Sequence, residues 1–195
     1  MQIIYSFDSA ALRFANFVLN GCGTVLTPVF KFITYLGNYG LIFIVAAAVL
    51  CLFRNTRLIG LTAICALFIG FLFTNVALKH IVARNRPFVN ENSPYYNYWL
   101  KAGALKESGY SFPSGHTTSA AAFSIAVFLC AKKRAAAFVL LAPLIMGFTR
   151  IYFGVHYASD VVGGLLVGAV AALIATIIVN RVFPHVLMRF SSKKS

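Results

Sequence analysis

Apolar stretches separated by short charged clusters run through most of the chain. The clearest of them, residues 58–78, holds 21 uncharged residues and is long enough to cross a lipid bilayer as one helix. This run and similar ones predict spanning helices at about 41–53, 58–78, 116–131, 135–150 and 160–180. In the last of these, Gly163, Gly164 and Gly168 favour close contact with a neighbouring helix. The pattern predicts an all-α, integral-membrane helical bundle.

The N-terminal stretch, residues 14–30, gives a weaker signal. It is uncharged, but asparagines, glycines and one proline interrupt its apolar pattern. It either spans the membrane as an irregular helix or lies partly in the interface. Residues 37–40 then predict a turn. We therefore expect about six transmembrane helices, or five if the N-terminal segment does not span. No linker or internal repeat divides residues 1–195, which indicates a single domain.

One long polar connection, the surface loop of residues 80–112, separates two of the predicted spans. It contains two prolines, several tyrosines and Trp99. Tyrosine and tryptophan favour the headgroup level, so we expect this loop on the membrane surface. A loop of this length between spans is usually functional or disordered, and its aromatic residues argue against disorder.

The composition, with 60% hydrophobic and 11% charged residues, agrees with a membrane protein. The net charge is +13, but many of the basic residues stand at the ends of apolar runs, so we expect no nucleic-acid partner. The acids are only Asp8, Glu91, Glu107 and Asp160. So few carboxylates can hardly form a two-metal hydrolase, which favours a mechanism with no metal and no cofactor. The four cysteines lie in apolar runs and are interpreted as small buried residues.

A cluster of ionisable residues lies between two apolar runs, at residues 149–160. Such groups at the border of a membrane span are costly, which makes them candidates for function. His156 and Asp160 are four residues apart. If a helix has begun there, the carboxylate can bond the imidazole and make its other nitrogen a better base or nucleophile. Arg150 offers a planar, charged fork for an oxyanion. The alternative is a helix-end ion pair without catalytic function.

A second cluster lies at the start of the long loop. Pro87 stops any helix at or before Arg86, so Lys79 lies near a helix end and Arg86 at the mouth of the loop. The alternative is a basic collar that reaches the lipid headgroups, which is our interpretation of His80 and Arg84.

The third cluster, Ser114, Gly115 and His116, opens a predicted span. Ser114 can cap the helix, and Gly115 lets a ligand approach the backbone closely. The N–H groups at a helix start bind anions such as phosphate, and His116 can exchange protons with a bound anion. The alternative is an ordinary N-cap with a structural histidine. Together the three clusters would form an oxyanion clamp with a nucleophile and a general acid.

Basic residues predict the orientation of the bundle. Arg54 and Arg57, residues 132–134 and the basic residues after position 180 fall on one side of the predicted spans. By the positive-inside rule that side faces the cytoplasm. The three clusters then lie on the opposite side, so we expect a multi-pass protein of the cell membrane with an extracytoplasmic active site.

The order and spacing of the clusters resemble a known family. Lys79-(six residues)-Arg86-Pro87, then Pro113-Ser114-Gly115-His116, then Arg150-(five residues)-His156-(three residues)-Asp160 resemble the three signature motifs of the type-2 phosphatidic acid phosphatase superfamily. The match covers the core motif region 79–160, and the helical pattern fits the bacterial-type membrane branch. Thr149 departs from the usual serine, but it keeps the hydroxyl group, so we expect a phosphate contact to survive.

The resemblance implies a role for each residue. His156 attacks phosphorus and becomes a phosphohistidine, and Asp160 orients it. His116 protonates the leaving oxygen and then activates water. The phosphoryl oxygens are held by Lys79, Arg86, Ser114, Gly115 and Arg150.

The resemblance also implies an activity, that of a metal-independent phosphatase for a membrane lipid phosphate or diphosphate. Polyprenyl diphosphates such as undecaprenyl diphosphate, phosphatidylglycerol phosphate and phosphatidic acid are the candidate substrates. One alternative is a haloperoxidase of the same fold, which would need vanadate and whose relatives are soluble. The other is a non-catalytic transporter or scaffold with a vestigial site. A transporter would show repeated, broken helices, which the sequence does not show. A vestigial site would have lost several motif residues, and here only Thr149 departs from the family pattern.

Overall fold

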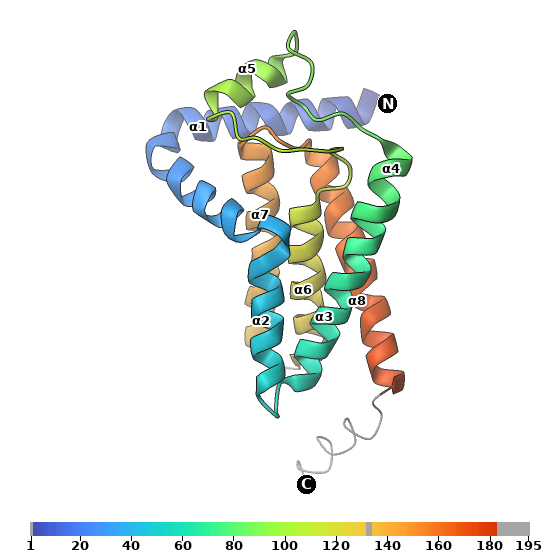
Figure 1. The fold of residues 1–195 in the computed structure, drawn as a ribbon. Coiled ribbons are helices and arrows are strands. Elements are labelled where there is room, and N and C mark those ends of the chain that lie inside the picture. Colours follow the sequence, from blue (N-terminus) through green and yellow to red (C-terminus); the bar gives the residue numbers. More distant parts are fainter. Residues whose placement is uncertain (1, 132–133, 183–195) are drawn as a thin grey trace.

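The structure is a computed structural model that describes residues 2–131 and 134–182. Every regular element in these residues is a helix, which confirms the predicted all-α class. The helices that run along a common axis are α2 (Leu41–Leu52), α3 (Arg57–Phe71) with its continuations η2 (Leu72–Leu78) and α4 (Lys79–Val82), α6 (Gly115–Ala131), η3 (Arg134–Leu140) with α7 (Leu141–Tyr152), and α8 (Ala158–Val182) (Figure 1).

These bundle helices lie at the predicted positions of the spans. The segments Arg57–Val82 and Ala158–Val182 are long and apolar enough to cross a membrane by length and composition, and so is Gln2–Leu36. The other bundle helices are apolar but shorter. Several basic residues that we assigned to the cytoplasmic side lie outside the described residues, namely Lys132, Lys133, Arg189, Lys193 and Lys194.

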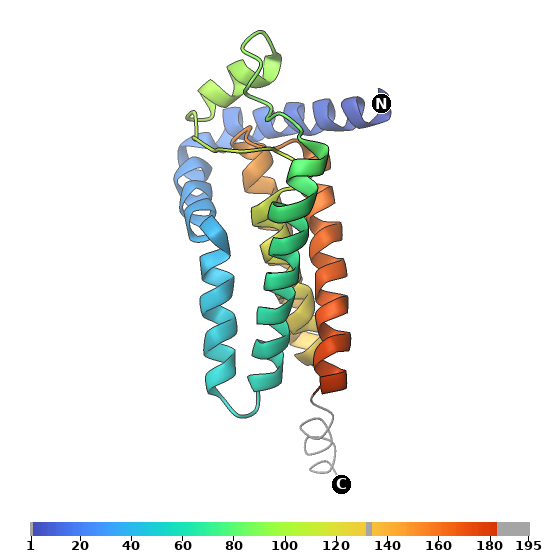
Figure 2. The same cartoon turned by 45° about the vertical axis from the view of Figure 1, so that its right-hand side comes forward.

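The N-terminal helix α1 (Gln2–Leu36) follows a different direction. Its first part lies across one end of the bundle, and the helix then bends toward α2 (Figures 1 and 2). Pro28 lies inside α1, and an internal proline is a common cause of a bend. Five helical segments thus run along the bundle axis, while the first part of α1 lies across one end of the bundle. The number of membrane spans stays a prediction.

The turn predicted at residues 37–40 is present between α1 and α2. It contains η1 (Asn38–Gly40), in which Tyr39 and Gly40 have positive φ angles of 54° and 70°. Such angles break helix geometry, so α1 and α2 are separate helices.

Helices α6 and α8 pack closely because small residues lie at their contact. A side-chain carbon added at Gly164 would lie 2.7 Å from the carbonyl oxygen of Ser114, and one added at Gly168 would lie 2.6 Å from Cβ of Ala121. Both distances are too short for real carbon contacts. The predicted close contact at these glycines is confirmed, and it holds the start of α6 against α8.

The long loop covers the same end of the bundle as α1 (Figure 1). Helix α4 ends at Val82 because Ala83 has a φ of 47°, which agrees with the prediction that Pro87 stops the helix at or before Arg86. The loop contains one short helix, α5 (Pro94–Lys101), which begins with a proline in its first turn and a hydrogen bond from the Tyr96 N–H group to Ser93 Oγ.

Candidate active site

The three motif segments meet at the end of the bundle that α1 and the loop cover (Figure 1). A cavity of about 690 Å³ lies among them. Five of the eight predicted residues line this cavity, namely Lys79, Arg86, Gly115, His116 and His156. The other three, Ser114, Arg150 and Asp160, are completely buried and contact residues of the same region. The structure therefore brings the predicted residues together, and their catalytic roles stay proposals.

His156 lies in the turn of residues 153–157, directly before α8. Its Nδ1 atom is 3.5 Å from Oδ2 of Asp160, which is an ion-pair distance and longer than a usual hydrogen bond. Oδ2 accepts a hydrogen bond of 2.9 Å from the N–H group of Tyr157 instead. The predicted Asp160–His156 hydrogen bond is therefore absent from the described residues, because α8 begins after His156. The carboxylate still faces the ring.

The other ring nitrogen of His156 faces Arg86. Nε2 lies 3.2 Å from Nη1 of Arg86, and because a guanidinium group only donates, Nε2 must be the acceptor. The ring proton then belongs on Nδ1, toward Asp160. Burial lowers the pKa of His156 well below its ordinary value of 6.5, and Arg86 and Arg150 lower it further. The ring is thus neutral near pH 7, with a lone pair on Nε2.

Arg86 is held by backbone oxygens on both sides. Its Nη1 atom donates to the carbonyl oxygen of Val155 at 3.0 Å, and Nε and Nη2 donate to the carbonyl oxygens of Gly109 and Ser108 at 2.9 and 2.8 Å. These bonds fix the guanidinium plane next to His156. The side chain is only 4% exposed, so this arginine is part of the interior and not of a headgroup collar.

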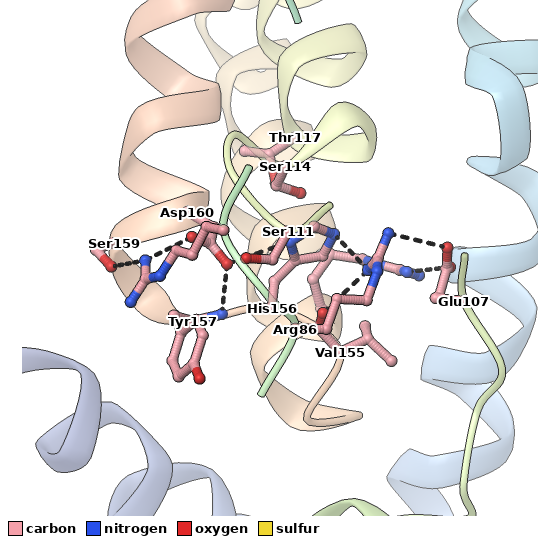
Figure 3. A network of polar contacts seen from close by, with 12 residues as sticks. Arg86, Glu107, Ser111, Ser114, Thr117, Val155, His156, Tyr157, Ser159 and Asp160 are labelled. Atoms are coloured by element: carbon pink, nitrogen blue, oxygen red, sulfur yellow. Dashed lines mark hydrogen bonds and ion pairs between the residues drawn. The ribbon is translucent and has the colours of Figure 1, made fainter. Parts of the chain in front are cut away.

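Glu107, from the long loop, occupies the space between the two buried arginines of the site. It forms an ion pair with Arg150, and its Oε2 atom lies 3.8 Å from Nη2 of Arg86. Figure 3 shows Glu107 on one side of His156, and Asp160 with Ser159 on the other. Burial alone would raise the pKa of Glu107, but attraction by Arg150 and Arg86 outweighs it and lowers the pKa. An ionised carboxylate therefore lies where the motifs predict an oxyanion.

Sequence reasoning did not find Glu107. The available signal was its rarity, since it is one of only four acids and it stands in the loop that faces three basic motifs. Its position relative to Arg150 depends on how the loop folds back, and neither spacing nor hydropathy gives that.

Lys79 and His116 lie on the α3–α4 and α6 sides of the cavity. Nζ of Lys79 donates to Oδ1 of Asn75 at 3.0 Å, and it would lie 3.9 Å from a side-chain carbon added at Gly115. Asn75 belongs to the π-helical segment η2, a geometry that is frequent at functional sites. Nε2 of His116 lies 3.0 Å from Oδ1 of Asn38, in the turn between α1 and α2. Neither asparagine was predicted.

Ser114 directly precedes α6 and joins it to α8. Its N–H group donates to the carbonyl oxygen of Asp160 at 3.0 Å, and its own carbonyl oxygen accepts from the N–H group of Thr118 at 2.9 Å. Its hydroxyl group accepts a hydrogen bond of 2.9 Å from Thr117 Oγ1. Ser114 thus marks the helix start as predicted, but its side chain is buried away from the cavity.

Thr149 is also buried and does not line the cavity. Its hydroxyl group donates to the carbonyl oxygen of Met146 at 2.7 Å and lies 3.1 Å from Oγ1 of Thr34. Thr34 in turn accepts a hydrogen bond of 2.7 Å from Nη1 of Arg150. The geometry gives no support to a direct phosphate contact. It makes Thr149 part of the support of Arg150.

Our interpretation of Arg84 as a headgroup cation is wrong. Its Nη1 atom donates to Oδ1 of Asp160 at 2.6 Å, and its Nη2 atom donates to Oδ2 of Asp8 at 2.9 Å. The left-handed conformation of Ala83 ends the helix just before Arg84, so the side chain is no longer on the helix face that the sequence pattern assigns to it. His80, which shared the interpretation, is exposed.

Comparison with known proteins assigns the chain to a family. A family profile of the PAP2 superfamily matches residues 57–184. An undecaprenyl-diphosphatase of Sulfolobus acidocaldarius is 30% identical over 137 residues, which cover 69% of this chain and 63% of that protein. The undecaprenyl-diphosphatase BcrC of Bacillus subtilis is 33% identical over 153 residues, 75% of this chain and 72% of the relative. The chain spans between 41% and 63% of the length of the first five curated relatives that it matches.

Two crystal structures resemble most of the fold. LpxE of Aquifex aeolicus aligns with a TM-score of 0.67 at 26% identity, over 85% of this chain and 93% of that chain. A PAP2-type phosphatidylglycerolphosphate phosphatase of Bacillus subtilis aligns with a TM-score of 0.69 at 25% identity, over 93% of this chain and 88% of the other. The match covers more than half of the chain, and the matched residues include all three motif segments, so the chain belongs to the PAP2 superfamily, as the resemblance predicted.

Proposed function

We propose that this chain is a metal-independent phosphatase that removes a terminal phosphate from a membrane lipid phosphate or diphosphate through a phosphohistidine intermediate. One observation carries the proposal. Arg86 and Arg150 already face an oxyanion, the carboxylate of Glu107, beside the unprotonated Nε2 atom of His156. A phosphate group has the charge and oxygen geometry to replace that carboxylate.

The first half-reaction follows from these positions. The phosphoryl oxygens are held by Arg86, Arg150, Lys79 and the backbone at Gly115. When a phosphoryl oxygen takes over the Nη1 hydrogen bond of Arg86, the Nε2 lone pair of His156 is free to form the new bond to phosphorus, while the bond from phosphorus to the leaving oxygen breaks. Asp160 stabilises the charge that develops on the ring through its contact with Nδ1. His116, on the same cavity, gives a proton to the leaving oxygen.

The second half-reaction consumes water. His116, now deprotonated, takes a proton from the attacking water molecule. The bond between phosphorus and Nε2 breaks, and inorganic phosphate leaves. Positioning and charge stabilisation supply most of what phosphoryl transfer needs.

The shape of the cavity supports a lipid as substrate. Its polar residues lie near His156, but it is also lined by apolar side chains of α2 and α3, namely Ile44, Ile64, Leu67, Phe68 and Phe71. Phe68 and Phe71 are 61% and 54% exposed, so the apolar part is open toward the outside of the bundle. An acyl or prenyl chain can follow this apolar side while the phosphate stays at the arginines.

The orientation of the bundle supports an extracytoplasmic site in a multi-pass membrane protein. The turn between α2 and α3, which contains Arg54 and directly precedes Arg57, lies at the opposite end of the bundle from α1 and α5 (Figure 1). By the positive-inside rule, the end with Arg54 and Arg57 faces the cytoplasm. Among the candidate substrates, polyprenyl diphosphate and phosphatidylglycerol phosphate agree with the names of the relatives.

The test is phosphate release by protein purified in detergent, with EDTA present. The panel consists of undecaprenyl diphosphate, phosphatidylglycerol phosphate, phosphatidic acid and a lipid A phosphate. Release by the wild type and none by His156→Ala supports the proposal. Halide oxidation after addition of vanadate, without phosphate release, would indicate a haloperoxidase. Neither activity would indicate a transporter or scaffold.

A further inference from the structure

A second polar cluster lies on the far side of Asp160 from His156. Arg84 is its centre, and Ser159 and Tyr157 surround it. Nη1 of Arg84 contacts Oδ1 of Asp160 at 2.6 Å and Oγ of Ser159 at 2.7 Å. The guanidinium carbon lies 3.9 Å from the centre of the Tyr157 ring, within the range of a cation–π contact. None of these contacts belongs to the phosphate-binding residues described above.

The cluster continues into the N-terminal helix. Asp8, on the part of α1 that crosses the bundle end, accepts a hydrogen bond of 2.9 Å from Nη2 of Arg84. Its two carboxylate oxygens also accept from the N–H and hydroxyl groups of Ser159, each at 2.8 Å. Asp8 is only 3% exposed, although most of the neighbouring α1 side chains are exposed. A buried carboxylate needs such partners, so this contact fixes where α1 lies.

Both oxygens of the Asp160 carboxylate are therefore anchored. Oδ1 is held by Arg84, and Oδ2 is held by the N–H group of Tyr157. Because both oxygens are hydrogen-bonded, the carboxylate is fixed in one orientation. In that orientation Oδ2 faces Nδ1 of His156. Because Asp160 and His156 are not directly hydrogen-bonded, the orientation of Asp160 depends on these other partners.

We infer that Arg84 positions Asp160 for the reaction at His156, and that Asp8 of α1 positions Arg84. The inference rests on the proposed function, because positioning matters only if His156 is the nucleophile. Arg84 is a positioning residue, since it lies on the opposite side of Asp160 from the cavity and does not line it. The N-terminal helix, which carries none of the family motifs, becomes part of the support of the active site.

The variants are Arg84→Gln, Arg84→Lys and Asp8→Asn, with Arg13→Gln as the matched control on an exposed arginine of α1. We expect kcat to fall roughly 100-fold in Arg84→Gln, with KM nearly unchanged, because the groups that hold phosphate are intact. Arg84→Lys keeps the charge near both carboxylates and restores part of kcat. Asp8→Asn lowers kcat less than Arg84→Gln does. Arg13→Gln leaves both constants at the wild-type value.

A double-mutant cycle separates positioning from general damage to the fold. In the Asp160→Asn background there is no carboxylate to orient, so adding Arg84→Gln should lower kcat by less than threefold. Equal losses from Arg84→Gln in both backgrounds would overturn the inference. An Arg84→Gln variant with wild-type kcat would overturn it as well.

Binding of orthovanadate gives a readout that does not need turnover. Vanadate adopts the five-coordinate geometry of phosphoryl transfer and can bond to an imidazole nitrogen. We expect its affinity, measured by titration calorimetry, to be at least tenfold lower in Arg84→Gln and unchanged in Arg13→Gln. Unchanged affinity in Arg84→Gln would overturn the inference. Absence of phosphate release by the wild type, with vanadate bound normally, would overturn only the proposed lipid phosphatase function.

Discussion

Nη1 of Arg86 lies 3.2 Å from Nε2 of His156, and this contact determines the state of the histidine. The arginine can only donate, so the nitrogen that faces the cavity carries a lone pair and the proton lies toward Asp160. The same guanidinium group is held by three backbone carbonyl oxygens. His156, the proposed nucleophile, and Arg86, a proposed phosphate ligand, are therefore fixed relative to each other before any substrate binds.

The first prediction concerns the nucleophile. His156→Ala should lower kcat/KM by several orders of magnitude, because no other group can form the covalent intermediate. Asp160→Asn should retain weak activity. The measurement is phosphate release, together with an alkaline quench of the reaction with labelled lipid phosphate, since phosphohistidine survives alkali. Label on the wild type that persists on His156→Ala would place the covalent step on another residue.

The second prediction concerns the fork of Arg150. Arg150→Lys keeps the charge but loses the planar arrangement that reaches both Thr34 and Glu107. We expect kcat/KM to fall roughly 100-fold, the size of loss seen when one oxyanion donor is removed. The control is Arg13→Lys on the exposed surface of α1. Wild-type kinetics of Arg150→Lys would show that a point charge is sufficient there.

The third prediction concerns Glu107, whose carboxylate competes with phosphate for the arginines. Glu107→Gln removes the competing charge, so orthophosphate should inhibit this variant at a concentration roughly tenfold lower than the wild type. A tenfold change corresponds to about 1.4 kcal/mol of binding free energy. Glu91→Gln, in the exposed part of the same loop, is the matched control. Weaker inhibition of Glu107→Gln would mean that the carboxylate helps to hold the ligand.

The fourth prediction concerns the protonation of His156. Because its pKa lies well below 6.5, the ring should stay neutral at a pH where an ordinary histidine is half protonated. Glu107 is the neighbour that favours the charged ring, so Glu107→Gln should lower the pKa further. Proton–carbon NMR of labelled histidines checks both statements, with His156→Asn used to assign the signal. A titration midpoint at 6.5 for His156 would contradict them.

The fifth prediction concerns sidedness. In a variant without Cys22, Cys51, Cys65 and Cys130, a cysteine at Asn92 should react with a membrane-impermeant thiol reagent on intact cells, or on spheroplasts if there is an outer membrane. A cysteine at Asn55, in the exposed turn between α2 and α3, should not react. One at Lys133 should behave like that at Asn55. The reverse labelling pattern would place the active site in the cytoplasm.

The position of all three motifs at one end of the bundle could be predicted from the sequence, because it depends only on where the spanning helices begin and end. Lys79 directly precedes the loop, Arg86 lies in its first part, His116 follows it and His156 lies two spans further on, so all of them fall at the same end of the bundle. The close contact of α6 with α8 could also be predicted from the glycines of α8, since only glycine lets the backbones approach to that distance.

The surroundings of the motifs were not predictable for a physical reason. Arg84 and Glu107 lie in irregular backbone, where no period of the sequence gives the direction of a side chain. Asp8 and Asn38 come from the N-terminal part of the chain, and their contacts depend on how α1 lies across the bundle. The hydropathy of α1 allows a span as well as an interfacial helix, so the pattern alone could not place these residues.

The tight contact between α6 and α8 has a consequence for how the molecule opens. Gly164 lies against the backbone of Ser114, so α6 cannot slide along α8 without a collision. The start of α6 carries His116, and His156 directly precedes α8. We therefore expect His116 and His156, the proposed proton donor and nucleophile, to move together. We therefore expect a bulky lipid to enter along the opposite wall of the cavity, which α2 and the exposed phenylalanines of α3 form.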